Sequence, residues 1–440
     1  MRLWQKTVLV LGTLFLYAAH LHAAAPSQLR IHGSNTIGAE LMPVLAESWL
    51  KGKGFTNVSR QPLGENELQV IGSNAAGEQL VIEIKAHGSS TAFADLGKGA
   101  SDIGMASRPI QASEVSSLAK LGRLNDVKSE YVLGLDGVAV IVNPANPLAK
   151  LDKGTLRKIF TGEVKDWSEV GGKGGAIHVL ARDAKSGTFD TFNSLVLDDK
   201  ALAAGAKRLE SNAELSDQVA ADPAAIGFTG LAYVKKNRVL AINDGGVAIP
   251  PTPFSVATED YALARRLFLY VPQMGQQSTL AKEFADFAVS AKGQQMIDQA
   301  GFVSQEIRAE ATEFATDLPD EYKQLTQGAK RLSLNFRFTK GSAELDNKAQ
   351  RDEERLVAYM KRDTNAKGKL LLFGFSDSNE AIPMVALSLA TDRADTVADS
   401  LIRQGLKPMR VRGYGSVAAV AANDNEAGRN KNRRVEVWVK

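Results

Sequence analysis

Residues 181–192 read Ala-Arg-Asp-Ala-Lys-Ser-Gly-Thr-Phe-Asp-Thr-Phe, and other parts of the chain repeat their chemistry. The apolar spacing that follows Ser-Gly-Thr predicts a helix that begins there. Ser186 or Thr188 would cap its first turn, where backbone N–H groups lack partners and the helix dipole is positive. With Arg182 nearby, these groups predict a site for a small oxyanion. The alternative is an ordinary capped turn beside a solvated arginine.

Two more loops combine small residues with hydroxyl groups after a short strand. The predicted strand at residues 29–31 runs into residues 33–38, and the predicted strand at residues 79–86 runs into residues 87–91. In α/β sheets, ligands bind at the carboxyl ends of strands, where such loops come together. Three similar loops therefore strengthen the prediction of a binding site between them.

Length and composition limit the classes of function. A chain of 440 residues predicts two or three domains, and 44% hydrophobic with 23% charged residues is typical of a soluble protein. The formal net charge of +3 does not indicate a nucleic-acid partner. The chain has no cysteine, and its five histidines lack metal-ligand spacing. We therefore expect no metal, no cofactor and no thiol chemistry.

Residues 1–25 predict a secretory signal peptide. Arg2 and Lys6 precede an apolar core at residues 7–19, and small residues at 23–25 suit a cleavage site. The core is too short to span a bilayer comfortably. We therefore expect a soluble protein exported to the periplasm, with an uncleaved anchor as the alternative.

With these features together, residues 28–305 resemble the PstS-like phosphate-binding proteins of ABC transporters. The matching pieces are Gly33-Ser34-Asn35-Thr36, Gly88-Ser89-Ser90-Thr91, residues 100–109, Ile159-Phe160-Thr161-Gly162 with Trp167, and Arg182 with Ser186-Gly187-Thr188. The resemblance implies an α/β type II periplasmic-binding fold over residues 26–305. Its two lobes would be joined by crossing strands near residues 131–142 and 225–233, with the ligand clamped between them.

The resemblance also implies which residues bind phosphate. They are Thr36, Ile37, Ser89 and Ser90 in the first lobe, with Arg108, and Arg182, Ser186, Gly187 and Thr188 in the second. Arg108 is a departure, because some family members have an aspartate there that accepts a hydrogen bond from protonated phosphate and so rejects sulfate. Arg108 adds a second positive charge or points elsewhere. Asp102 and Asp183 are the alternative acceptors, and another oxyanion stays open as the ligand.

A second domain follows a predicted linker at residues 306–331. From residue 332 the predicted order is β-α-β-α-β-β, which indicates a small α+β domain. Residues 332–440 resemble the OmpA-like peptidoglycan-binding domain. The matching pieces are residues 338–345, Gly374-Phe375-Ser376-Asp377, Leu389 to Arg393-Ala394, Gly413-Tyr414-Gly415 and residues 428–437.

This second resemblance implies that Asp377 takes the ammonium group, and Arg393 the carboxylate, of diaminopimelate in the peptidoglycan stem peptide. Arg433, with Arg429 and Asn432, would supply secondary contacts. The alternative is that Asp377 and Arg393 pair with each other. The family's asparagine about eight residues after the aspartate is missing, because Val385 or its neighbour stands there, and the intervening loop is one residue longer.

We therefore expect a non-enzymatic periplasmic protein that closes its lobes around phosphate or a similar oxyanion and is tethered to peptidoglycan. An ABC permease is a further candidate partner. One alternative is an envelope-anchored structural or sensing protein with a different ligand or none. The other is a phosphoester hydrolase that uses Ser186, although no histidine lies near it in the sequence. We expect His32 and His87, beside two of the loops, to be packing residues.

Overall fold

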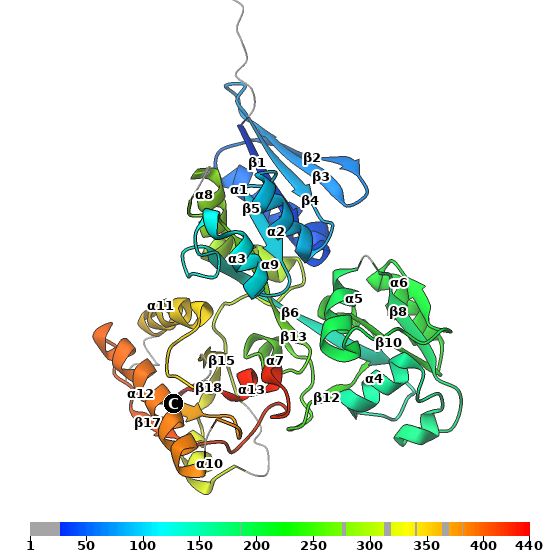
Figure 1. Cartoon of the computed structure of the whole chain (residues 1–440), viewed down its shortest axis with the longest axis vertical. Helices are drawn as coiled ribbons and strands as arrows, with labels where there is room; N and C mark the ends of the chain where they lie inside the picture. Colours follow the sequence, from blue (N-terminus) through cyan, green and yellow to red (C-terminus); the bar gives the residue numbers. More distant parts are fainter. Residues whose placement is uncertain are drawn as a thin grey trace, which may run out of the picture.

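A computed structural model describes residues 27–184, 186–274, 279–311, 318–338, 341–362, 369–380 and 382–440. The predicted signal peptide at residues 1–25 lies outside these ranges. Figure 1 shows two lobes, drawn mainly in blue to cyan and in green, and a third body in yellow to red. Within the part of the chain described, no helix combines the length and apolar character needed to cross a bilayer.

The first lobe is built on the strand order β2-β3-β4-β1-β5-β13. Its strands are β1 (Ser27–Gly33), β2 (Asn57–Gly64), β3 (Glu67–Ser73), β4 (Gln79–Lys85), β5 (Ile103–Ala106) and β13 (Ala264–Tyr270). Its helices are η1 (Ile37–Leu41), α1 (Met42–Gly52), α2 (Ser89–Lys98), α3 (Ala112–Ser117), η2 (Ala119–Leu121), α8 (Thr279–Val289) and α9 (Ala291–Gln299). β1 lies parallel to β4 and β5, so their carboxyl ends meet at one edge.

The second lobe continues the same sheet through β10, β8 and β9. Its strands are β7 (Lys150–Asp152), β8 (His178–Arg182), β9 (Lys207–Leu209), β10 (Ala225–Gly230), β11 (Arg238–Val239) and β12 (Ala241–Asn243). Its helices are α4 (Lys153–Thr161), η3 (Trp167–Val170), α5 (Gly187–Phe192), η4 (Asn193–Leu197), α6 (Asn212–Ala221), η5 (Leu231–Tyr233) and α7 (Pro253–Ala257). Phe192 stacks on Phe228 in its core, with ring centroids 4.0 Å apart.

One long strand, β6 (Glu130–Val142), passes through both lobes, since it pairs with β13 and then with β10. The second crossing, predicted near residues 225–233, is wrong. Those residues form β10, which lies between β6 and β8 inside the second lobe. Its apolar side chains are fully buried there, and a short apolar run between glycines suits a core strand as well as a crossing. The chain instead returns through residues 258–263 into β13.

The C-terminal domain has the predicted β-α-β-α-β-β order, with a short extra helix before the last strand. Its elements are β15 (Lys330–Arg337), α11 (Asn347–Arg362), β16 (Leu370–Phe375), α12 (Pro383–Arg403), β17 (Arg410–Gly413), α13 (Glu426–Asn432) and β18 (Arg434–Val439). The linker was predicted to contain some helix, and it contains α10 (Asp320–Thr326) together with a short strand that was not predicted, β14 (Ala309–Glu310). β14 pairs with β15, and Tyr322 of α10 is buried against Phe373 and Trp438.

The C-terminal domain holds the segment that leads into β13. Asn335 Nδ2 and Arg337 Nη2 donate hydrogen bonds to the carbonyl oxygen of Thr258, at 2.8 and 2.7 Å. Arg331 forms a 2.8 Å ion pair with Asp260, and Lys431 Nζ donates to the carbonyl oxygen of Tyr261 at 2.6 Å. All these donors are at least partly buried, so the domain is fastened directly beside the strands that join the two lobes.

Candidate functional site

The predicted binding loops leave the carboxyl ends of three strands. β1 leads to Thr36, β4 leads to α2 at Ser89, and β8 ends at Arg182, just before α5. Ser186 is the N-cap of α5, because its Oγ accepts a hydrogen bond from the backbone N–H of Phe189 at 3.3 Å. Gly187 and Thr188 in the first turn of α5 line the smaller cavity, at the positive end of the helix dipole.

Two neighbouring cavities contain almost all the predicted phosphate ligands. Thr36 shares a cavity of about 550 Å³ with Arg182, Ser186, Gly187 and Thr188. A larger cavity of about 1180 Å³ is lined by Ser89, Ser90 and Arg108. Asn35, Glu65, Asn66 and Ala184 line both cavities, so the two spaces adjoin. Ile37 lines neither, and its side chain is buried in the first lobe.

The lobes touch each other at the boundary between these cavities. A Cβ atom added to Gly187 would lie 1.7 Å from Thr36 Oγ1 and 2.6 Å from the Thr36 backbone nitrogen, so only glycine fits. A second contact between the lobes is the hydrogen bond from the Tyr233 hydroxyl to Glu40, at 2.9 Å. The two lobes are therefore in direct contact at this boundary.

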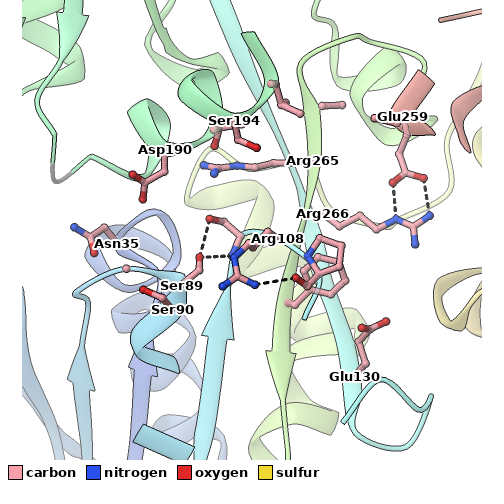
Figure 2. Close-up of a pocket in the computed structure, with 18 of the residues that line it drawn as sticks. Asn35, Ser89, Ser90, Arg108, Glu130, Asp190, Ser194, Glu259, Arg265 and Arg266 are labelled. Carbon is pink, nitrogen blue, oxygen red and sulfur yellow. Dashed lines mark hydrogen bonds and ion pairs between the residues drawn. The ribbon is translucent and has the colours of Figure 1, made fainter. Parts of the chain in front are cut away.

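Arg265 is a site residue that the sequence interpretation missed. Its Nη2 donates to Thr36 Oγ1 at 2.7 Å and pairs with Asp136 at 3.0 Å, and the Arg265 and Asp136 side chains are only 8% and 7% exposed. Figure 2 shows Arg265 reaching from β13 between Asp190 and Ser194, which belong to the second lobe. The only signal in the sequence is the Arg265-Arg266 pair at the start of an otherwise apolar strand.

Arg182 is largely buried at the edge of the smaller cavity. Its Nη2 donates to the carbonyl oxygen of Glu210 at 2.5 Å, and its Nε donates to that of Leu209 at 3.3 Å. Burial lowers the pKa of Arg182, although Asp183 and Glu40 oppose that effect. The backbone carbonyls orient the guanidinium without neutralising its charge, so the positive charge is available to an anion.

Arg108 is paired with a carboxylate of its own lobe. Its two terminal nitrogens each lie 2.8 Å from an oxygen of Glu114, and Nη1 also donates to the carbonyl oxygen of Pro109. The side chain still lines the larger cavity, but this bidentate pair neutralises the second positive charge expected there.

The two aspartates named as alternative acceptors occupy different places. Asp102 pairs with Arg30 at 2.8 Å, just before β5, and lines neither cavity. It is therefore excluded as an acceptor, because it lies at the amino end of the strand. Asp183 does line the smaller cavity.

A third aspartate, Asp190 of α5, lines the larger cavity and is open to it. The surrounding protein raises the pKa of Asp190 by desolvation, and Arg265 opposes the rise. In Figure 2 its carboxylate points into the space above Asn35, Ser89 and Ser90. Asp190 therefore offers a hydrogen-bond acceptor opposite the hydroxyl groups of the first lobe.

The two loop histidines form hydrogen-bond contacts with nearby carboxylates. His32 is buried, with its ring nitrogens 2.9 Å from Asp95 and 3.0 Å from Glu83. His87 lines the larger cavity and lies 2.8 Å from Glu67. Neither ring contacts Ser186, so no serine–histidine pair forms there among these residues.

The C-terminal domain supplies part of the wall of the larger cavity. The lining residues from this domain are Arg337, Phe338, Asp346, Ala427, Asn430 and Lys431. Arg266 of β13 points the other way from Arg265 and is held between Glu259 and Asp346. The cavity between the lobes therefore extends to the docked domain.

In the C-terminal domain, Asp377, Arg393 and Arg433 are all buried, and each has a partner. Arg433 Nη1 lies 2.8 Å from Asp377, whereas Arg393 forms a bidentate pair with Glu380 at 2.8 and 2.5 Å. Asp377 and Arg393 are therefore not paired with each other. Arg429 pairs with Glu426, and Asn432 bonds the backbone at residues 420 and 421.

Comparison with protein-family models separates the chain into two parts. Residues 68–292 match the model described as a PBP superfamily domain, and residues 337–433 match the OmpA family. The first match covers the second lobe and the part of the first lobe from β3 onward, and the second covers most of the C-terminal domain.

The chain is also similar to known phosphate-binding proteins over part of its length. The phosphate-binding protein PstS of Bacillus subtilis is 32% identical over 216 residues, which are 49% of this chain and 68% of that protein. The PstS of Staphylococcus haemolyticus is 31% identical over 227 residues, or 49% of this chain and 70% of that protein. The crystal structure of an ABC-type phosphate transport receptor from Vibrio cholerae has 25% identity and a TM-score of 0.50, and covers 62% of this chain and 99% of that one.

Proposed function

The chain belongs to the PBP superfamily, and on this premise we propose that it binds inorganic phosphate between its lobes while its C-terminal domain tethers it to peptidoglycan. The observation that most supports the first half is the cavity that Thr36 shares with Arg182, Ser186 and Gly187. Hydroxyls, free helix N–H groups and a guanidinium from two lobes meet there, and this combination suits a small tetrahedral oxyanion.

The phosphate lies where the two cavities adjoin, next to Thr36. Ser89 and Ser90 contribute from the first lobe, and Arg182 with the α5 N-terminus contributes from the second. Arg265, whose charge is paired with Asp136, adds a hydrogen-bond donor from the joining strand. Because these groups belong to different lobes, a bound anion contacts all of them only when the lobes are closed, and it therefore stabilises the closed state over the open state.

Asp190 is the acceptor for a proton on the phosphate. It takes over the role that an aspartate in place of Arg108 would have, since Arg108 is paired with Glu114. Sulfate has no proton at neutral pH and leaves this carboxylate facing an oxygen, which is repulsive. Phosphate is therefore preferred over sulfate.

The C-terminal domain takes the diaminopimelate of the stem peptide through Asp377 and Arg393, with Arg433 beside them. The match to the OmpA family supports this half. The protein thus acts in the periplasm, attached to the cell wall, and passes phosphate to an ABC permease within its reach. These three statements rest on the family matches and the predicted signal peptide.

Calorimetric titration of the full chain with phosphate, sulfate and molybdate tests the first half. We expect binding of phosphate, and we expect Arg182→Ala to weaken it by about 10- to 100-fold, because a hydrogen bond to a charged group contributes about 1.5–3 kcal/mol. The matched control is Arg157→Ala, whose side chain pairs with Asp198 and lines neither cavity.

Heat with none of the three anions would contradict the proposal. Hydrolysis of a phosphoester that Ser186→Ala abolishes would favour the hydrolase instead.

A further inference from the structure

The carboxylate side of the predicted diaminopimelate clamp is already occupied by a side chain of this protein. Glu380 Oε2 lies 2.8 Å from Arg393 Nη1, and Glu380 Oε1 lies 2.5 Å from Arg393 Nη2. This is the geometry that a free carboxylate would adopt on a guanidinium. The two side chains are 0% and 1% exposed, so no second carboxylate reaches Arg393 while Glu380 is there.

Two further donors of Arg393 have partners as well, since Nη1 also donates to the carbonyl oxygen of Phe375 at 3.5 Å. Its Nε donates to the carbonyl oxygen of Ser342 at 3.1 Å, and its guanidinium lies 5.5 Å from the ring centre of Phe338. Glu380 is held in turn by the backbone N–H of Gly341 at 3.0 Å. Arg393 is thus pre-oriented for a bidentate carboxylate, and Glu380 meets that requirement.

The ammonium side of the clamp is filled in the same way. Arg433 Nη1 lies 2.8 Å from Asp377 Oδ2, and both side chains are buried. A guanidinium therefore stands where the ammonium of a stem peptide would approach. Both residues of the predicted clamp therefore already have partners within this protein. Asp377 is paired with Arg433, and Arg393 is paired with Glu380.

We propose that Glu380 is an internal competitor for the carboxylate of diaminopimelate, and that it sets the affinity of the C-terminal domain for peptidoglycan. This inference rests on the proposed peptidoglycan binding. The stem peptide binds only when Glu380 swings away from Arg393 and the incoming carboxylate replaces it. The measured dissociation constant is then the intrinsic one divided by the fraction of molecules in which Arg393 is released.

The position of Glu380 makes such a movement feasible. It lies in the segment between β16 and α12, and α12 begins three residues later. The α12 start is exposed, with Ile382 69% and Met384 80% accessible, so nothing packs over it within the described chain. Because Glu380 belongs to this loop and not to a strand or helix of the core, its release requires the loop to move and leaves β16 and α12 in place.

Binding of the full chain to purified sacculi tests the inference. We expect Glu380→Gln to lower the apparent dissociation constant for diaminopimelate-containing sacculi at least about tenfold, because a neutral amide competes less well for Arg393. The matched control is Glu344→Gln, an exposed glutamate in the neighbouring loop that does not contact Arg393. It removes the same charge and should leave binding unchanged.

Two further binding measurements test whether the gain in affinity of Glu380→Gln depends on Arg393. Sacculi with lysine in place of diaminopimelate lack the competing carboxylate, so Glu380→Gln should gain nothing on them. Glu380→Gln combined with Arg393→Lys keeps the positive charge, loses the bidentate geometry and should lose the gain.

The outcomes separate the two proposals. Equal binding by the wild type and Glu380→Gln would overturn the competitor role and leave the tether standing. Absence of binding by both would overturn the tether, and the competitor role with it. An equal gain with Glu344→Gln would show a simple charge effect and would also overturn the inference.

Discussion

At the scale of single residues, we expect Asp190 to distinguish phosphate from sulfate. Its carboxylate opens to the larger cavity, and desolvation raises its pKa while Arg265 opposes the rise. We predict that Asp190→Asn reduces the ratio of phosphate to sulfate affinity by about 10- to 100-fold, because a neutral amide replaces the charged acceptor and no longer repels sulfate. Competition calorimetry with the two anions measures this ratio.

The raised pKa also predicts a pH dependence. As the pH falls through the raised pKa of Asp190, the carboxylate takes up a proton and no longer accepts one from phosphate. Phosphate binding by the wild type should therefore weaken at a higher pH than an unshifted aspartate would allow, and Asp190→Asn should lack that component. An identical pH profile for the two proteins would exclude Asp190 as the acceptor.

At the scale of elements, the N-terminus of α5 meets the loop after β1 at Gly187. We predict that Gly187→Ala prevents full closure, because its Cβ would lie 1.7 Å from Thr36 Oγ1 and the backbone nitrogen is also close. Overpacking of this kind costs about 1–3 kcal/mol, which weakens phosphate binding by roughly 5- to 150-fold. Calorimetry and the radius of gyration with phosphate present measure the effect.

Gly205→Ala is the matched control for this substitution, because nothing lies within 4 Å of the Cβ it adds. It should bind phosphate and compact as the wild type does. Normal compaction of Gly187→Ala in phosphate would mean that the lobes close around the anion by another contact.

At the scale of the whole molecule, a buried charge cluster fastens the C-terminal domain to the lobes. Arg331 lies between Asp260 of the lobes at 2.8 Å and Glu436 of β18 at 3.4 Å. Burial alone would raise the pKa of Glu436, but Arg331 and Arg434 outweigh it and lower the pKa to about 2. Its folded value is thus below the ordinary 4.5, so Glu436 stabilises the folded protein above that pH.

We predict that this contribution is lost as the pH falls from about 4.5 towards 2, and that Glu436→Gln already lacks it at pH 7. Removing one partner of a buried ion pair costs about 3–5 kcal/mol, so the variant should unfold at a clearly lower temperature. Thermal unfolding from pH 7 to pH 2 tests this. If the unfolding temperatures of the variant and the wild type changed with pH by the same amount, the role of the cluster would be contradicted.

Much of the architecture follows from local patterns. The alternating side chains of β4 and the cap at Ser186 are properties of neighbouring residues, so the sequence could predict them. The second crossing could not be predicted, because β10 and a crossing strand have the same short apolar pattern. β10 pairs with β6, more than eighty positions away, and with β8, 47 positions away, so its place in the sheet depends on distant residues.

The site divides in the same way. The sequence alone determined that the three hydroxyl-bearing loops and Arg182 were candidate parts of the site, because each lies at the end of a strand or the start of a helix. Only the folded chain could bring Arg265 to Thr36, 229 residues apart, or Glu380 onto Arg393 and Glu114 onto Arg108. The pairing of a buried charge depends on which groups share its low-dielectric surroundings, and spacing along the chain does not specify that.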